Sequence, residues 1–167
     1  DAAVMISTAL DHLSDHEVLK FSEDEYHIYP KHCYEQYYFV SNHDHSLKKI
    51  AFPLKGMKDI IIDGNGSEFI FHGRITPFLL ENSCNITIKN LSINYARPFF
   101  TEGKILETDE NYMVLRIDRD KYPFQIQDNK ITFTGENYGS EYMKWLVEFN
   151  PECKDLAYGT GVSDVRN

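Results

Sequence analysis

The chain has 167 residues and a formal net charge of −9, from 17 Lys and Arg against 26 Asp and Glu. With 42% hydrophobic and 26% charged residues, its composition is that of a globular domain and not of a disordered tail or a fibre. The cations are scattered along an acidic chain without forming a cluster, which disfavours nucleic-acid binding. No apolar run approaches the ~18 residues that would span a membrane.

The cysteine pattern excludes two further classes of protein. Cys33, Cys84 and Cys153 are far apart, odd in number and without a C-x-x-C pair, so they encode neither a disulfide framework nor a zinc ribbon. The first residues show no basic region and no cleavage site of a signal peptide. The sequence alone therefore leaves the cellular compartment open.

The first residues predict a short amphipathic helix followed by strands. Apolar side chains recur there at spacings of three, four and three, which places them on one helical face: Ala3, Ile6, Leu10 and Leu13. Short strands are expected at 18–21 and 26–29, on either side of an acidic turn. Beyond this point the pattern is almost entirely that of short strands.

The middle of the chain contains an internal repeat. The segments 58–64 and 84–90 align at an offset of 26 residues, which places Ile60 over Ile86 and Ile62 over Ile88. Between the two copies, further strands are expected at 68–72 and 77–80, which makes three strands per repeat. Three strands per repeat are typical of a parallel β-helix, in which each coil pairs with the next and the helix would cover the first coil. An ordinary β-sandwich with a chance match is the alternative, because two copies are few.

Hairpins are predicted after residue 100. Strands at 105–108 and 112–117 flank a polar turn, and strands at 124–127 and 130–133 flank the turn Asp128-Asn129. Hairpins are antiparallel, so this region is expected to differ from the β-helix coils. The predicted fold is all-β, organised as a capping helix with the first coils (1–100), a β-hairpin insertion subdomain (101–150) and a return toward the β-helix that looks truncated (151–167).

An ordered set of short motifs resembles one known family across nearly the whole chain. The set comprises 38–44 (YFVSNHD), 49–54 (KIAFPL), 62–69 (IDGNGSEF), 72–78 (HGRITPF), 90–95 (NLSINY), 97–99 (RPF), 121–123 (KYP) and 147–151 (VEFNP). The sequence thus resembles the N-terminal portion of the bacterial blood-group-B-type α-1,3-galactosidases, glycoside hydrolase family 110. At Asn94 the family pattern leads us to expect Asp.

The resemblance implies a right-handed parallel β-helix and an exo-acting enzyme that removes terminal α-1,3-linked galactose from glycans with inversion. Such a reaction uses an acid and a base carboxyl group ~6.5–9.5 Å apart. The family's enzymes are several times longer, and the resemblance places their catalytic acids in later coils, so no catalytic residue is assigned within this chain. No cofactor is expected, the partner is an oligosaccharide or glycoconjugate with terminal galactose, and export to the periplasm or the cell exterior is compatible with the family.

Arg97 and Glu102 are the candidates for substrate binding, because they lie where the repeat region ends and a loop can reach a sugar hydroxyl. Arg offers five donors in a fixed fork and Glu accepts two hydroxyls, although an exposed ion pair is the simpler interpretation. Asp63 beside Gly64 is interpreted as a turn former and not as a catalytic acid. Trp145 can stack on a galactose ring, or belong to a hairpin core.

No metal site is predicted. His43 and His45 alternate and can face one ion if they lie on a strand, but their segment is a polar loop with no third or fourth ligand.

Two other functions remain open from the residues alone. A polysaccharide lyase or pectinase uses the same coil architecture, although its uronic-acid substrates favour a basic groove that this acidic chain does not show. A noncatalytic β-helix module that binds glycans is equally compatible with the fold, because function resides in sites and not in folds. The oligomeric state is open.

Overall fold

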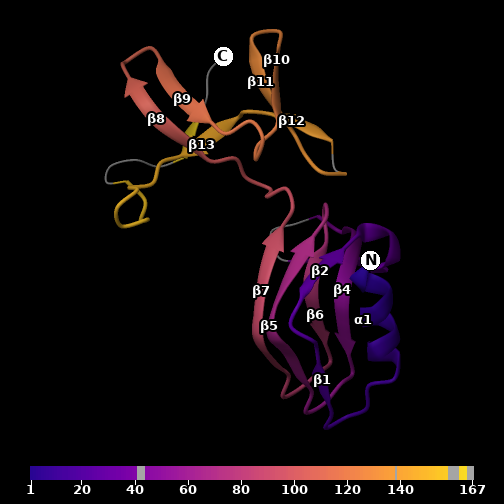
Figure 1. Ribbon diagram of the computed structural model, residues 1–167. Helices are drawn as coiled ribbons and strands as arrows, with labels where there is room; N and C mark the ends of the chain where they lie inside the picture. The colour runs from indigo at the N-terminus through magenta and orange to yellow at the C-terminus, as the bar shows by residue number, and fades with distance from the viewer. Residues whose placement is uncertain (41–43, 138, 158–161, 165–167) are drawn as a thin grey trace. The chain divides into compact units, whose positions relative to one another are not determined.

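The computed structural model describes residues 1–40, 44–137, 139–157 and 162–164, and it is all-β apart from one α-helix and one short 3-10 helix (Figure 1). Contacts divide the chain into two units, residues 1–98 with 136–138, and residues 99–135 with 139–167. Each unit is described by itself.

The first unit consists of α1, η1 and seven strands. Their bounds are α1 (Ala2–Asp11), β1 (Val18–Lys20), β2 (Glu25–Ile28), η1 (Pro30–His32), β3 (Tyr34–Tyr38), β4 (Ser46–Lys55), β5 (Ile61–Phe71), β6 (Thr76–Glu81) and β7 (Thr87–Tyr95). One sheet places β5 in the centre, with β1 and β2 parallel to it along one edge and β7 parallel to it along the other. The second sheet has the order β3-β4-β6, in which β4 and β6 are parallel and β3 is antiparallel.

The 26-residue repeat of the sequence corresponds to strand pairing in both sheets. Ile62 pairs with Ile88 in the first sheet, and Phe52 pairs with Phe78 in the second. The turns repeat as well, because Asp59 and Asn85 both have positive φ, at 58° and 54°. These residues at equivalent positions of the two copies therefore lie side by side.

The predicted separation between strands at 60–62 and 68–72 is wrong. β5 runs without interruption from Ile61 to Phe71, and only a register shift between Asp63 and Ser67 marks the expected turn. Gly64 allows this close packing, since a Cβ there would lie 2.4 Å from the Leu91 Cβ. The first copy is thus followed by two strands, the long β5 and the short β6, and not by three strands.

The core of the first unit lies between the two sheets and under the helix. Ala3, Ile6 and Leu10 are buried, as their helical spacing predicts, and α1 contacts β4 and β2. Asp1 caps the helix by accepting a hydrogen bond from the Ala3 amide at 3.0 Å. The role of α1 as the cover of a first coil stays a prediction.

Aromatic rings fill the space between the sheets. Phe21 meets Phe69 edge to face with centroids 5.1 Å apart, and Phe52 stacks on Phe78 at 4.7 Å. The high aromatic content of the sequence thus serves packing in this unit.

The second unit consists of short antiparallel strands. Their bounds are β8 (Gly103–Thr108), β9 (Met113–Ile117), β10 (Phe124–Gln127), β11 (Lys130–Thr134), β12 (Ser140–Tyr142), β13 (Trp145–Val147) and β14 (Val162–Asp164). Both predicted hairpins are confirmed, β8 with β9 and β10 with β11. Asp128 and Asn129 form the second turn with φ of 49° and 59°, which suits a two-residue hairpin loop. Over the described residues these sheets do not close into a barrel.

Candidate functional site

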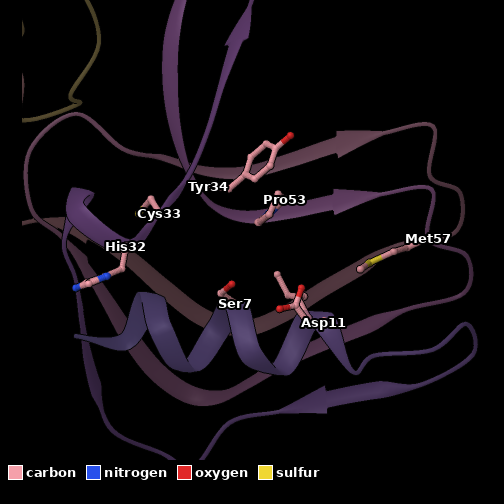
Figure 2. Close-up of a pocket in the computed structure, with 8 residues that line it drawn as sticks. Ser7, Asp11, His32, Cys33, Tyr34, Pro53 and Met57 are labelled. Carbon is pink, nitrogen blue, oxygen red and sulfur yellow. The ribbon is translucent and has the colours of Figure 1, made fainter.

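A hollow of 280 Å³ opens between the helix and the second sheet of the first unit (Figure 2). In Figure 2, Ser7 and Asp11 rise from the side of α1 that faces Pro53 of β4. The hollow is lined by Ser7, Leu10, Asp11, His32, Cys33, Tyr34, Pro53 and Met57. Its size lies at the small end of the usual range for ligand sites, about 300–1,000 Å³.

The chemistry of the hollow is that of hydrogen bonding and not of covalent catalysis. Burial raises the pKa of the Cys33 thiol to about 11, with Lys49 lowering it and Glu35 raising it to smaller degrees. Cys33 is therefore a neutral thiol at physiological pH and a poor nucleophile. The Ser7 hydroxyl and the Asp11 carboxylate offer hydrogen-bonding groups suited to a polyol.

Beside the hollow lies a sheet-face cluster made by Tyr34, Gln36, Tyr38, Lys55 and Glu81. The first three alternate along β3 and so share one face, while Lys55 and Glu81 are paired neighbours on β4 and β6. The Tyr38 hydroxyl donates to Glu81 Oε2 at 2.8 Å. Lys55 Nζ lies 3.0 Å from the Tyr34 hydroxyl and 3.2 Å from Glu81 Oε2.

The protonation states of the sheet-face cluster are fixed near neutral pH. The Tyr38 hydroxyl and then Lys55 hold the pKa of Glu81 below its usual range, so Glu81 is ionised. Hydrogen bonds to Tyr34 and Glu81 raise the pKa of Lys55, so Lys55 stays protonated. Neither group is poised for general acid or base catalysis, which needs a pKa near the working pH.

A second polar cluster, the imidazole chain, lies at the end of the other sheet and consists of Glu25, His27, His72 and Glu136. Glu25 and His27 alternate on β2, His72 directly follows β5, and Glu136 lies between β11 and β12 but belongs to the first unit. Sequence reasoning missed this cluster. The histidines are 45 positions apart in the sequence, and His72 and Glu136 are 64 positions apart, so no local spacing could have indicated the cluster.

The structure supports the interpretation of Asp63 as a turn former. Its carboxylate accepts hydrogen bonds from the Asn65 amide and the Asn90 side chain, both at 3.0 Å, and lies 3.6 Å from Lys89 Nζ. These contacts, the Asn90 bond foremost, lower the pKa of Asp63. An ionised, fully engaged carboxylate has the properties of a structural group.

The two residues proposed to bind substrate have different surroundings. Arg97 is buried in the first unit, where its guanidinium donates to the Pro98 carbonyl at 2.6 Å. Glu102 is exposed in the second unit, where it accepts from the Tyr122 hydroxyl at 2.9 Å and lies 3.6 Å from Lys121 Nζ. Their role in binding a sugar stays a prediction.

The structure describes two of the three remaining candidates. Trp145 is exposed on β13, and His45 lies 5.5 Å from the Tyr37 ring, centroid to centroid. His43 lies outside the described residues. Among the described residues no group of three or more His, Cys, Asp or Glu side chains is arranged to hold a metal ion, and no helix is long and apolar enough to cross a membrane.

Comparison with known proteins links both units to one group of enzymes. The sequence model described as "GLAA-B beta-barrel domain I" matches residues 101–167. Over 164 residues the chain is 34% identical to "Alpha-1,3-galactosidase B" of Bacteroides thetaiotaomicron, which covers 96% of the chain and 26% of that relative. The chain is thus a homologue of named α-1,3-galactosidases over almost its whole length.

Two further relatives agree. "Alpha-1,3-galactosidase A" of Shewanella woodyi is 33% identical over 95% of the chain, and "Alpha-1,3-galactosidase B" of Parabacteroides distasonis is 42% identical over 86%. The chain covers 26% and 24% of these two relatives. It therefore spans about a quarter of the length of the curated α-1,3-galactosidases that it matches.

Proposed function

We propose that the protein to which this chain belongs hydrolyses terminal α-1,3-linked galactose from glycans, as an exo-acting glycosidase that inverts the anomeric centre. The observation that supports this proposal is the 33–34% identity to named α-1,3-galactosidases over 95–96% of the chain. The substrate is an oligosaccharide or glycoconjugate with terminal galactose. The comparisons do not favour the lyase or the noncatalytic module.

The catalytic carboxyl pair is proposed to lie outside this chain. A glycosidase needs a general acid whose pKa is raised, so that it is protonated at the working pH. The described carboxyl groups with a shifted pKa, Asp63 and Glu81, are both shifted downward by hydrogen bonds. Groups held ionised in this way are suited to structure and not to proton donation.

We also propose that the first unit is the start of a right-handed parallel β-helix. The second sheet and the first part of β5 pair at an offset of 26 residues, and the rest of β5 pairs at an offset of 24 beyond the register shift. Right-handed connections are the strong preference for parallel strands. Leu54 on β4 has no exposed surface, whereas Leu80, its partner on β6, is 52% exposed. In a β-helix the next coil would cover Leu80 as β6 covers Leu54.

The same asymmetry occurs in the other sheet. Phe69 on β5 is 1% exposed, and its partner Ile93 on β7 is 44% exposed. Hydrogen exchange of the β6 and β7 amides tests the proposal when this chain is compared with the full-length protein. Strong protection in the full-length protein alone is expected, and equal exchange in both would contradict a following coil.

The proposed division of the chain into three parts follows from the proposed β-helix. Residues 1–100 would hold the capping helix and first coils, 101–150 the β-hairpin insertion, and 151–167 the return toward the β-helix. Limited proteolysis of the full-length protein tests this division, with the first cuts expected near residues 100 and 150.

Galactose release tests the enzymatic proposal directly. An α-1,3-galactosyl oligosaccharide is incubated with this chain and, in parallel, with the full-length protein, and proton NMR identifies the first anomer released. We expect β-galactose from the full-length protein and none from this chain. Activity in this chain would overturn the placement of the catalytic carboxyl groups. Absence of activity from both, with cleavage of polygalacturonate or sugar binding alone, would favour the lyase or the binding module.

A further inference from the structure

The imidazole chain joins four titratable side chains end to end. Glu25 Oε1 lies 2.7 Å from His27 Nε2, His27 Nδ1 lies 2.8 Å from His72 Nε2, and His72 Nδ1 lies 2.7 Å from Glu136 Oε1. All three separations are those of hydrogen bonds. Both nitrogens of both rings are thus engaged.

The contact between the two imidazole rings has the geometry of a hydrogen bond and not that of two ligands to one metal ion. The ring centroids are 5.1 Å apart while the facing nitrogens are 2.8 Å apart, so the nitrogens lie between the two ring centres. The rings therefore meet nitrogen to nitrogen, which leaves space for one proton between them. A metal ion bound to both nitrogens at about 2.0–2.1 Å would need them to converge from the side.

The three hydrogen bonds of the imidazole chain require three hydrogens. Each of the three contacts needs one hydrogen, because two lone pairs facing each other at such distances repel. Two neutral imidazoles supply one N–H each, and two ionised carboxylates supply none. When all three hydrogen bonds are formed, the imidazole chain therefore holds a third proton. The four side chains together then have a net charge of −1.

We propose that this third proton makes the imidazole chain a pH-sensitive latch. The latch holds Glu136 and Asn137 against His72 and Gly73, at the end of β5. With the proton bound, all three hydrogen bonds form. As the pH rises and the proton leaves, one bond must break, and an unpaired nitrogen then faces a carboxylate or a second nitrogen. The contact of Glu136 with His72 is weakened at high pH and present at low pH.

The surroundings of His72 support this assignment. The Tyr29 ring stacks on the His72 ring with centroids 4.0 Å apart and an angle of 11°, and His72 is 9% exposed. Glu136 Oε2 is a buried atom without a hydrogen-bond partner in the described part of the chain. An ionised carboxylate with an unpartnered oxygen is costly, so a shared proton near Glu136 is favoured.

The neighbouring strands contribute one further charge. Glu68 on β5 is the register partner of Glu25 and is bonded to the Asn94 amide at 3.3 Å. Glu68 therefore places a second carboxyl group beside Glu25 on the same face of the sheet. Tyr29 supplies an aromatic face and no charge at neutral pH.

Backbone geometry at Gly73 allows the latch to close. Gly73 has φ of +80°, and a Cβ there would lie 3.1 Å from the Glu136 carbonyl oxygen and 3.4 Å from the Asn137 Cβ. A larger residue would be strained and would press against the docked segment. The sequence thus leaves room for Glu136 and Asn137 directly beside His72.

The Glu136→Gln variant separates the proton count from a merely structural contact. A glutamine amide can donate to His72 Nδ1, so two neutral imidazoles and one amide supply all three hydrogens without an extra proton. The variant should therefore keep the segment docked and lose the dependence on pH. Glu110→Gln, in an exposed turn, is the matched control.

The test follows the imidazole nitrogens and the Asn137 amide of the 167-residue chain by NMR, from about pH 5 to about pH 9, a range that brackets imidazole titration. In the wild type and the control we expect the ratio of docked to undocked protein to fall roughly tenfold or more across this range, because a hydrogen bond to a charged group is weakened. The nitrogen signals of His27 and His72 should change together with pH. Independent titration of the two rings, a pH-invariant Asn137 signal in the wild type, or a Glu136→Gln variant that responds to pH as the wild type does would each overturn the latch.

Discussion

The two units of the chain bury their hydrophobic residues very differently. Every buried hydrophobic residue of the described part lies in the first unit, except Tyr122. In the second unit, Ile126, Trp145 and Phe149 are exposed. Parallel strands stacked at a 26-residue offset enclose their inward side chains between two sheets, whereas isolated hairpins leave both faces open. Pairing between distant segments therefore creates a core here, and pairing between adjacent ones does not.

The largest expected effect comes from removing a ring between the two sheets. Phe69→Ala should lower the free energy of unfolding of the first unit by about 3–5 kcal/mol, because it leaves a cavity among packed aromatic rings. Ile126→Ala in the second unit should change stability by less than about 0.5 kcal/mol. Urea unfolding with segment-resolved hydrogen exchange measures both, and equal costs would contradict the contrast between the units.

A smaller difference in the free energy of unfolding is expected between two paired leucines of the first unit. Leu54→Ala should cost about 2–5 kcal/mol, because Leu54 is fully buried. Its register partner Leu80 is half exposed, so Leu80→Ala should cost less than about 1 kcal/mol. The same unfolding measurement applies to both variants. In the full-length protein the cost at Leu80 should rise toward that at Leu54, and a cost that stays unchanged would argue against a following coil.

The turn carboxylate Asp63 should make the first unit sensitive to acid. Its pKa is lowered in the folded chain by Asn90, Asn65 and Lys89, so its contribution is present above the unfolded pKa of about 3.9 and is lost as the pH falls through the folded pKa. Asp63→Asn should lower stability at pH 7 and reduce the loss on acidification. Asp11→Asn, at an exposed position of α1, is the control for urea unfolding at neutral and acidic pH. An unchanged acid response in Asp63→Asn would exclude this role.

The smallest effect is one of chemical reactivity. At neutral pH, iodoacetamide should modify Cys33 roughly a hundredfold more slowly than the exposed Cys84 and Cys153, because little Cys33 is thiolate when its pKa is about 11. The Cys33 rate should still rise above pH 9. Mass spectrometry of the labelled peptides follows all three sites in one sample, and similar rates would show that Cys33 is not shielded.

Much of the local structure could be predicted from the sequence, for reasons that particular residues make clear. Ile6 and Leu10 belong to the apolar face of an amphipathic helix, and this periodic signal acts within a few residues. The cap at Asp1 was not predicted. The turn Asp128-Asn129 likewise determines its own hairpin. The boundary between strands at 62 and 68 was not predictable, because neighbouring strands hold β5 together across its register shift.

The candidate site was less predictable than the fold. The family could be inferred from ordered motifs, but Arg97 and Glu102 were chosen for their position in the sequence, and the structure finds Arg97 buried against its own backbone. The imidazole chain was missed, because each of its histidines looks ordinary among its sequence neighbours.

The sequence by itself determined the helix, the hairpins, the 26-residue repeat and the family, because periodicity, turn chemistry and ordered motifs are properties of nearby residues. Only the tertiary structure decided which strands pair in parallel, that Asp63 is a fixed structural carboxylate, and that Glu25, His27, His72 and Glu136 form one chain of hydrogen bonds. Such pairings join residues tens of positions apart, and their energies come from packing and shared protons that exist only once the sheets have formed.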